Sequence, residues 1–226
     1  MQDRREDRWR FVVGLGNPGR QYARTRHNVG FRVLEALRRR WGADDGRSAF
    51  GGKVYDARPS RPDAGPRRVL LLEPHTYMNC SGRSVREAAT FYKAAPDDLL
   101  IVLDDMNLPL GRLRARAGGS AGGQKGLADI LQALGTQDVP RLRIGIGPPP
   151  GRMDGVEYVL SSFGEDEREE VDAAIEAAAE AAEDWVFRGL PSVMGRYNRK
   201  PDDGPAPAGD QDRGARPGKT TESDEV

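Results

Sequence analysis

The chain has 226 residues, and its 35 basic and 35 acidic side chains give a formal net charge of zero at pH 7. This length predicts one domain that needs no disulfide framework, and Cys80, the lone cysteine, excludes an internal one. The charged start MQDRREDRWR does not fit a secretory signal and no apolar run approaches the roughly 20 residues of a membrane span, so we expect a cytoplasmic protein that does not enter membranes.

The two ends differ in composition from the rest of the chain. We expect residues 1–9 to be a flexible lead-in and residues 201–226 to be a disordered acidic tail, because the tail is rich in Pro, Gly and charge. The tail holds seven acidic and three basic residues, which leaves 32 basic and 28 acidic residues in 1–200. The predicted domain, 10–200, is therefore mildly basic, as suits an anionic partner.

Strand and helix patterns alternate through this domain. In chain order the sequence predicts a strand at 9–15, a helix at 29–41, strands at 53–57 and 68–72, a helix at 81–92 capped by Ser81, strands at 99–103 and 112–115, a helix at 125–134 ended by Gly135, a strand at 141–146, and helices at 165–188 and 192–197. The loop at 58–66, RPSRPDAGP, is expected to lack regular structure. The alternation predicts an α/β fold, with a twisted mixed sheet flanked by helices in a single compact domain.

The first polar motif, GLGNPG at 14–19, directly follows the first predicted strand. It matches G-x-G-x-x-G, a pattern typical of dinucleotide-binding sites. The next helix is expected only at Val29, too late for its N-terminus to receive a pyrophosphate. A simple turn, and a substrate loop in which Asn17 supplies an amide group, are the alternatives to nucleotide binding.

Histidine is scarce in this chain, which contains only His27, in TRHNVG, and His75, in PHTYMNCSG. A reaction that needs a base near neutral pH must use one of these two residues or a carboxylate, since imidazole has a reference pKa of about 6.5. A lone histidine is more often structural than catalytic. The polar loop around His27 nevertheless favours a functional site there.

Further candidate groups follow two predicted strands. Asp104 and Asp105 end an apolar strand, where a carboxylate can orient a histidine, although a solvated turn is the alternative. No convincing set of further metal ligands accompanies them. Met78 and Asn79 follow another strand, and they either line a pocket there or belong to the core and to a helix cap.

The glycine-rich segment RARAGGSAGGQKG leads into the predicted helix at 125–134. Backbone amides and arginines suit phosphate groups, whereas a flexible linker is the alternative. The chain contains no P-loop and no H-E-x-x-H. The residues alone therefore indicate an α/β enzyme with a histidine base and an anionic substrate.

The ordered motifs VGLGNPGRQYARTRHNVGF, PHTYMNCSG, DDMNLPLGRLR, GGSAGGQKGL and RLRIGIGPPPG resemble the bacterial peptidyl-tRNA hydrolase family over residues 10–198. The resemblance implies a monomeric enzyme without metal or cofactor that cleaves the ester between peptide and tRNA in peptidyl-tRNA. It also implies roles for eight residues: His27 as catalytic base, Asp104 as the acid that orients it, Asn17 and Asn79 as holders of the peptide and ester, Tyr22 and Met78 as pocket walls, and Arg116 and Arg143 as tRNA contacts.

The chain departs from this family pattern in one place. The family usually reads GGHNG in the glycine-rich loop, and this sequence reads GGQKG, with Gln124 and Lys125 at the substrate-binding positions. A charged lysine cannot accept a hydrogen bond, but it can stabilise an oxyanion or bind a phosphate. The departure leaves open a second hypothesis, a non-catalytic RNA-binding relative of the same fold.

Overall fold

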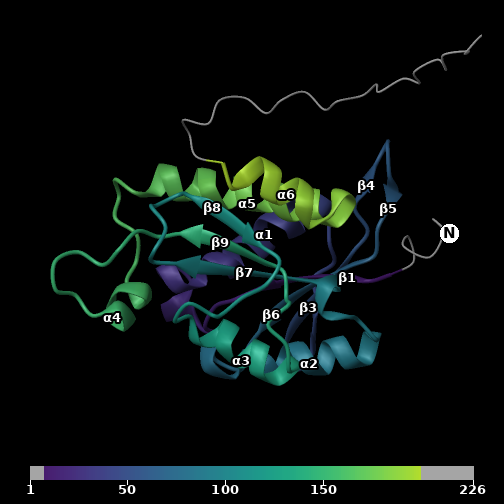
Figure 1. Ribbon diagram of the computed structural model, residues 1–226, viewed down its shortest axis with the longest axis horizontal. Helices are drawn as coiled ribbons and strands as arrows, with labels where there is room; N and C mark the ends of the chain where they lie inside the picture. Colours follow the sequence, from purple (N-terminus) through teal and green to yellow (C-terminus); the bar gives the residue numbers. More distant parts are fainter. Residues whose placement is uncertain (1–7, 200–226) are drawn as a thin grey trace, which may run out of the picture.

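A seven-stranded mixed sheet forms the centre of the fold in the computed structural model, which describes residues 8–199 (Figure 1). The strands, in spatial order, are β2 (Arg47–Ala49), β3 (Gly52–Ala57), β6 (Val69–Pro74), β1 (Arg10–Gly14), β7 (Leu99–Asp105), β9 (Arg141–Gly145) and β8 (Leu113–Arg116). The four central strands β6, β1, β7 and β9 are parallel, and the outer pairings are antiparallel. The predicted mixed α/β sheet is thus confirmed.

Helices cover both faces of the sheet (Figure 1). One layer contains α1 (Val29–Trp41), α5 (Arg168–Arg188) and α6 (Leu190–Tyr197), and the other contains α2 (Ser81–Tyr92) and α3 (Lys125–Leu134). Each layer packs on its own apolar cluster, and every residue of β7 is buried between them. Both faces of the central strands are therefore covered, as expected for parallel strands.

The predicted boundaries of α1, α2 and α3 are confirmed residue for residue. Their apolar residues recur at helical spacing, and Gly42 and Gly135 end α1 and α3 in the left-handed conformation, with φ of +57° and +68°. The predicted N-cap Ser81 is wrong, because Cys80 holds that position. A short 3-10 turn, Met78–Cys80, precedes the helix, and the Ser81 hydroxyl donates back to the Met78 carbonyl oxygen at 2.9 Å.

Two glycines bring α1 unusually close to the sheet. A Cβ atom on Gly14 would lie 2.4 Å from the Gly30 carbonyl oxygen, and one on Gly30 would lie 2.4 Å from the Leu15 amide nitrogen. Neither position can hold a larger residue without displacing the backbone. These glycines therefore serve helix–strand packing, and they place the residues just before α1 beside the ends of β1 and β7.

Two other expectations need correction. The loop at 58–66 contains a small antiparallel ladder, β4 (Ser60–Arg61) with β5 (Gly65–Pro66). A turn at residues 62–64, followed by Gly65 with φ of +62°, reverses the chain, and Arg61 forms ion pairs with Glu183 and Asp184 of α5. A short helix, α4 (Gly155–Leu160), was not predicted. Asp154 caps it by accepting hydrogen bonds from the Val156 and Glu157 amides.

The structure describes only residues 8 and 9 of the predicted lead-in and none of the predicted tail. Residues 1–7 and 200–226 lie outside the described residues, so those expectations stay predictions there. Arg8 forms an ion pair with Asp98, and the Trp9 ring lies 4.8 Å from the Tyr92 ring. Contact with the folded domain therefore begins by residue 8.

Candidate active site

A cavity of about 530 Å³ opens at the carboxyl ends of β1, β7 and β9. This edge of a parallel sheet is where α/β proteins place ligands. The predicted site residues that line the cavity are Asn17, His27, Met78, Asn79, Asp104, Gln124, Lys125 and Arg143. Six separate parts of the chain thus contribute predicted residues to one pocket.

His27 and Asp104 form a direct pair in this cavity. His27 belongs to the 3-10 turn Arg26–Asn28, just before α1, and Asp104 lies near the end of β7. The His27 Nδ1 atom is 2.8 Å from the Asp104 Oδ2 atom. The Asp104 side chain is only 3% exposed and that of His27 is 13% exposed. A nearly buried carboxylate thus holds one nitrogen of the ring, while the ring itself borders the cavity.

Asn28 holds the loop that carries Asn17. The Asn28 side chain accepts a hydrogen bond from the Asn17 backbone amide and donates one to the Asn17 backbone carbonyl oxygen, both at 2.9 Å. The Asn17 Oδ1 atom in turn accepts from the Met78 amide at 3.0 Å. Since Oδ1 is engaged in this way, the Asn17 amide group is oriented as a donor. Sequence reasoning missed Asn28, whose only signal was its position beside His27.

The two adjacent aspartates have different partners. Asp105 accepts from the Arg143 guanidinium at 3.1 Å, and its other oxygen accepts from the backbone and side chain of Asn107. Asp104 has no arginine or lysine partner among residues 8–199. The charge of Asp105 is therefore balanced within the protein, whereas that of Asp104 faces His27.

Gln124 and Lys125 stand where the glycine-rich loop enters α3. Gln124 is the N-cap of this helix, and its Nε2 atom lies 3.3 Å from Asp104 Oδ1. Lys125 is the first helical residue and is exposed at the cavity. The N-terminus of a helix carries a partial positive charge, and Lys125 adds a full one. Both charges would attract an anion bound at this place.

An apolar wall completes the cavity and was not predicted. It includes Val156, Val159 and Leu160 from α4, together with Met106. Val156 and Leu160 are 52% and 38% exposed, so their apolar side chains are accessible to a ligand in the cavity. The i, i+3, i+4 spacing of these three residues after Asp154 was the signal in the sequence.

Arg26 anchors the His27 turn to the segment around α4. Its guanidinium donates to both carboxylate oxygens of Glu167, at 2.8 and 2.6 Å. The same group lies between the rings of Tyr158 and Phe163, at 4.4 and 4.5 Å from their centres. The hydrogen bond from Arg26 holds the pKa of Glu167 below its usual range. The residue next to the histidine is therefore immobilised by contacts more than 130 positions away.

We expect Arg26→Met to lower the free energy of unfolding by about 2 kcal/mol, because it leaves the partly buried Glu167 carboxylate without its main partner. Chemical denaturation measures this change, and Arg32→Met, which removes an ion pair with the exposed Asp172, is the matched control. A carboxylate with a lowered pKa adds stability at neutral pH and loses that contribution as pH falls through its folded-state value. The difference between wild type and Arg26→Met should therefore shrink below about pH 4; a difference that does not depend on pH would contradict this role.

Three residues considered in the sequence lie elsewhere. Tyr22, in a 3-10 turn, is half-buried and does not line the cavity, and Arg116 is exposed on the edge strand β8 outside it. His75 lies 3.6 Å from Glu73, and its side chain is 42% exposed. His27 is thus the one histidine that lines the cavity.

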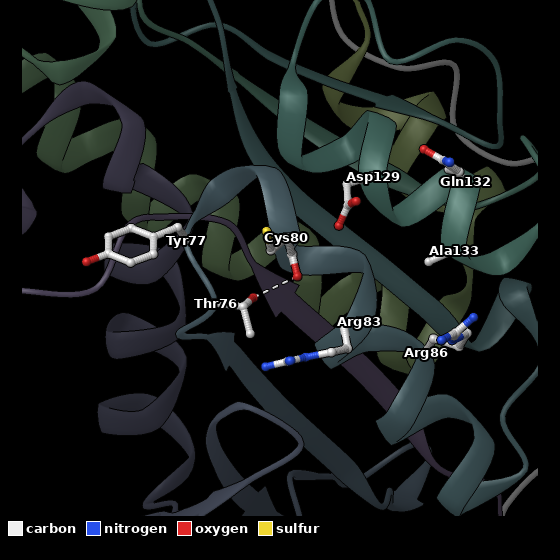
Figure 2. A pocket seen from close by; sticks show the side chains of 8 residues that line it. All are labelled: Thr76, Tyr77, Cys80, Arg83, Arg86, Asp129, Gln132 and Ala133. Carbon is white, nitrogen blue, oxygen red and sulfur yellow. Dashed lines mark hydrogen bonds between the residues drawn. The ribbon is translucent and has the colours of Figure 1, made fainter.

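A second groove, of about 610 Å³, lies between α2 and α3 (Figure 2). Thr76, Cys80, Arg83 and Asp129 are among its lining residues, and the Thr76 hydroxyl donates to the Cys80 carbonyl oxygen at 2.8 Å. Tyr77 lines both this groove and the cavity, with a positive φ of 58°. Neither histidine lines this groove, whereas His27 lines the cavity.

Residues 8–199 contain no cluster of three or more His, Cys, Asp or Glu side chains arranged to hold a metal ion. Within the same residues, no helix has the length and apolar character of a membrane span.

The fold and the cavity together define an α/β protein with an enzyme-like site, in which a buried aspartate holds a histidine beside amide and cationic groups. The family model for peptidyl-tRNA hydrolase matches residues 11–204. A peptidyl-tRNA hydrolase of Rhodopirellula baltica is 48% identical over 84% of this chain and 97% of its own length. One of Thermus thermophilus is 48% identical over 83% and 94%. This chain belongs to the peptidyl-tRNA hydrolase family.

A solved structure supports the same assignment. The Arg119Gln mutant of peptidyl-tRNA hydrolase from Acinetobacter baumannii superposes with a TM-score of 0.76 at 36% identity, covering 84% of this chain and 94% of that one. The family resemblance and the predicted fold are therefore confirmed together.

Proposed function

We propose that the cavity around His27 hydrolyses the ester that joins the carboxyl end of a peptide to the terminal ribose of tRNA. The contact between His27 and Asp104 carries the proposal, because it leaves one ring nitrogen free to act as a base beside a pocket with polar and apolar walls. Family membership supplies the substrate class.

The tautomer of His27 follows from its partner. An ionised carboxylate can only accept hydrogen bonds, so Nδ1 must carry a proton and donate the hydrogen bond to Asp104. In the neutral ring Nε2 is then unprotonated, and it can take a proton from water. Asp104 would stabilise the imidazolium that forms, as the third member of a catalytic triad does.

The proposed reaction balances without a metal or cofactor. The water oxygen bonds to the ester carbonyl carbon while His27 Nε2 takes its proton. The bond between that carbon and the ribose oxygen then breaks, and the imidazolium returns the proton to the ribose oxygen. The products are a peptide with a free carboxyl group and an intact tRNA. The amide groups of Asn17 and Asn79 are the proposed donors to the oxyanion. In other acyl-transfer enzymes, one such donor stabilises the transition state by roughly 3 kcal/mol.

The walls of the cavity suit the two halves of this substrate. The apolar side chains of α4 and Met78 can contact the peptide, and Lys125 and Arg143 can contact tRNA phosphates. Arg116, exposed on β8, is proposed to contact the tRNA outside the cavity. The role suggested for Tyr22 as a pocket wall stays a prediction. A monomer in the cytoplasm is part of the same proposal.

Cleavage of N-acetyl-aminoacyl-tRNA, with the unacetylated aminoacyl-tRNA as control, tests this function. We expect release of the acetylated amino acid and little cleavage of the control, since a free amino group cannot replace the peptide bond in its contacts. A folded protein that binds RNA but leaves both esters intact would contradict the proposal and favour the non-catalytic RNA-binding hypothesis.

Lys125 gives a separate prediction about tRNA binding. We expect Lys125→Asn to raise the KM for the tRNA substrate several-fold and to reduce the slope of log(kcat/KM) against log salt by about one, because one phosphate contact is lost. Lys93→Asn is the matched control, since Lys93 is exposed at the far end of α2 in a left-handed conformation that asparagine tolerates. An unchanged salt slope together with a lower kcat would instead assign Lys125 to the oxyanion.

A further inference from the structure

The orientation of the Gln124 amide follows from its contacts. Its Oε1 atom accepts a hydrogen bond from the Leu127 backbone amide at 2.8 Å, and a backbone amide can only donate. Its Nε2 atom must therefore point the other way, where it lies 3.3 Å from Asp104 Oδ1 and 3.3 Å from the Met78 sulfur. Both of these atoms are acceptors, so the assignment of oxygen and nitrogen is consistent.

The two oxygens of Asp104 thereby receive one donor each. Oδ2 accepts from His27 and Oδ1 from Gln124, and the carboxylate is 3% exposed, so little water is available to replace either donor. A donor on each oxygen resists rotation of the carboxylate about its own axis. Because the Gln124 amide is neutral, it satisfies Oδ1 without a positive charge that would compete with the imidazolium of His27.

Glutamine is also an unusual choice for an N-cap. Serine, threonine, aspartate and asparagine are preferred there, because their short side chains reach the first free amides of the helix. The longer Gln124 side chain caps α3 and also reaches Asp104, on β7. A departure from local preference at a site is expected where the residue serves function.

We infer that Gln124 is a positioning residue, whose amide holds Asp104 so that the aspartate keeps His27 in the orientation and tautomer needed for hydrolysis. The inference rests on the proposed function and refines the substrate-binding role first expected for Gln124. It assigns Gln124 an action through Asp104 rather than through the substrate.

Gln124→Ser separates the two contacts of this side chain. Serine can still cap α3 but is too short to reach Asp104. We expect the free energy of unfolding to be unchanged or higher, kcat to fall about tenfold and KM to change less than about twofold, since only the alignment of the base is altered. Unchanged kcat in this folded variant would overturn the inference.

Gln124→Glu tests the coupling through charge. Glutamate can still accept from the Leu127 amide, but it places a second carboxylate oxygen against Asp104 Oδ1. The added negative charge should favour protonated His27, so the rising limb of kcat/KM against pH moves to higher pH. The other charged groups that line the cavity, Asp105, Lys125, Arg143 and Asp154, are the same in both proteins.

Nuclear magnetic resonance titration of the two histidine rings supplies a measurement independent of activity. The His27 signals should titrate at higher pH in Gln124→Glu than in wild type, while the signals of His75, which lies outside the cavity beside Glu73, should stay in place. An unmoved His27 titration would overturn the inference. Failure of wild type to cleave N-acetyl-aminoacyl-tRNA would instead overturn the proposed function, and the titration would still decide the role of Gln124.

Discussion

Replacing His27 with alanine is expected to lower kcat by about 10³-fold while leaving the fold intact, because a positioned general base contributes roughly 10²- to 10⁴-fold. His27 borders the cavity from a 3-10 turn, and its ring is hydrogen-bonded to Asp104. Its loss should cost little packing. Single-turnover cleavage of N-acetyl-aminoacyl-tRNA measures the rate, and the thermal unfolding midpoint checks the fold.

His75→Ala is the matched control, since His75 is the only other histidine of the chain and lies outside the cavity. It should retain near-wild-type kcat.

Asp104→Asn should lower kcat about as much as His27→Ala does, because an asparagine amide that donates to Nδ1 would place the ring proton on Nε2 and remove the base. The double variant should lose little more than either single variant, as expected for residues that act as a unit. Near-normal turnover by His27→Ala would refute the mechanism.

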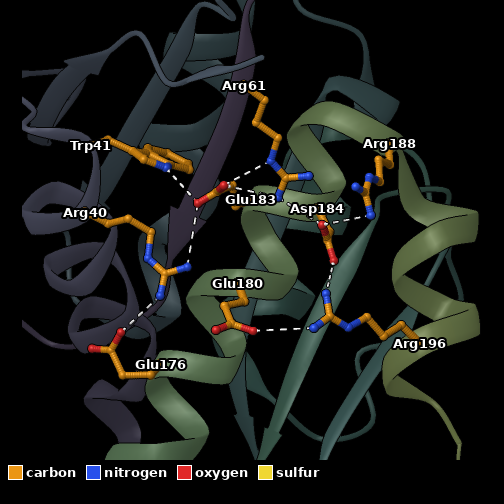
Figure 3. A network of polar contacts seen from close by, with 9 residues as sticks. All are labelled: Arg40, Trp41, Arg61, Glu176, Glu180, Glu183, Asp184, Arg188 and Arg196. Atoms are coloured by element: carbon orange, nitrogen blue, oxygen red, sulfur yellow. Dashed lines mark hydrogen bonds and ion pairs between the residues drawn. The ribbon is translucent and has the colours of Figure 1, made fainter. Parts of the chain in front are cut away.

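The largest expected effect on stability comes from Asp184 on α5 (Figure 3). Its carboxylate is 3% exposed and forms ion pairs with Arg61 at 3.0 Å, Arg196 at 2.8 Å and Arg188 at 3.9 Å. These partners come from the β4–β5 hairpin, α6 and the end of α5 itself. One buried carboxylate on α5 thus joins the β4–β5 hairpin and α6 to that helix.

We expect Asp184→Ala to lower the free energy of unfolding by about 3–5 kcal/mol. The substitution removes a buried carboxylate that three arginines share, and one of them, Arg61, is itself partly buried. Glu180→Ala is the control: Glu180 is half exposed and contacts Arg196 at 3.7 Å, so its loss should cost less than about 1 kcal/mol. Urea denaturation measures both. Equal effects of the two substitutions would show that burial of Asp184 does not set its contribution.

The neighbouring Glu183 shares Arg61 with Asp184 and connects the network to α1. Its carboxylate accepts from Arg61 at 3.1 Å and from the Trp41 indole at 3.2 Å, and it pairs with Arg40 at 3.6 Å (Figure 3). Arg61 therefore keeps one acid partner in Asp184→Ala. The protein should consequently remain folded at room temperature, and its kcat should be close to wild type, because the network lies away from the residues that line the cavity.

The elements that could be predicted from sequence are those with a local signal. The helices at 29–41 and 125–134 combine apolar spacing with a glycine at the end, and β7 is a wholly apolar run. The ladder β4–β5 lacks such a signal. It depends on the ion pairs of Arg61 with residues more than 120 positions away, which no local pattern contains.

The site shows the same division between local and distant determinants. The sequence predicts β1 and β7 as strands but not that they are neighbours, so the contact between His27 and Asp104 was expected only from the family resemblance. The contacts of Arg26 with Glu167, and the two contacts of Gln124, depend on three-dimensional placement. The six-residue helix α4 was missed because it is short and follows a glycine- and proline-rich segment.

Single-turnover cleavage of N-acetyl-aminoacyl-tRNA in water enriched in heavy oxygen shows whether a water molecule activated by His27 attacks the ester carbonyl. We expect heavy oxygen in the carboxyl group of the released acetyl-amino acid, an intact and unlabelled tRNA 3′ end, and release of both products about 10³-fold more slowly in His27→Ala. Unlabelled acid, a label on the tRNA ribose, or cleavage within the RNA would contradict it.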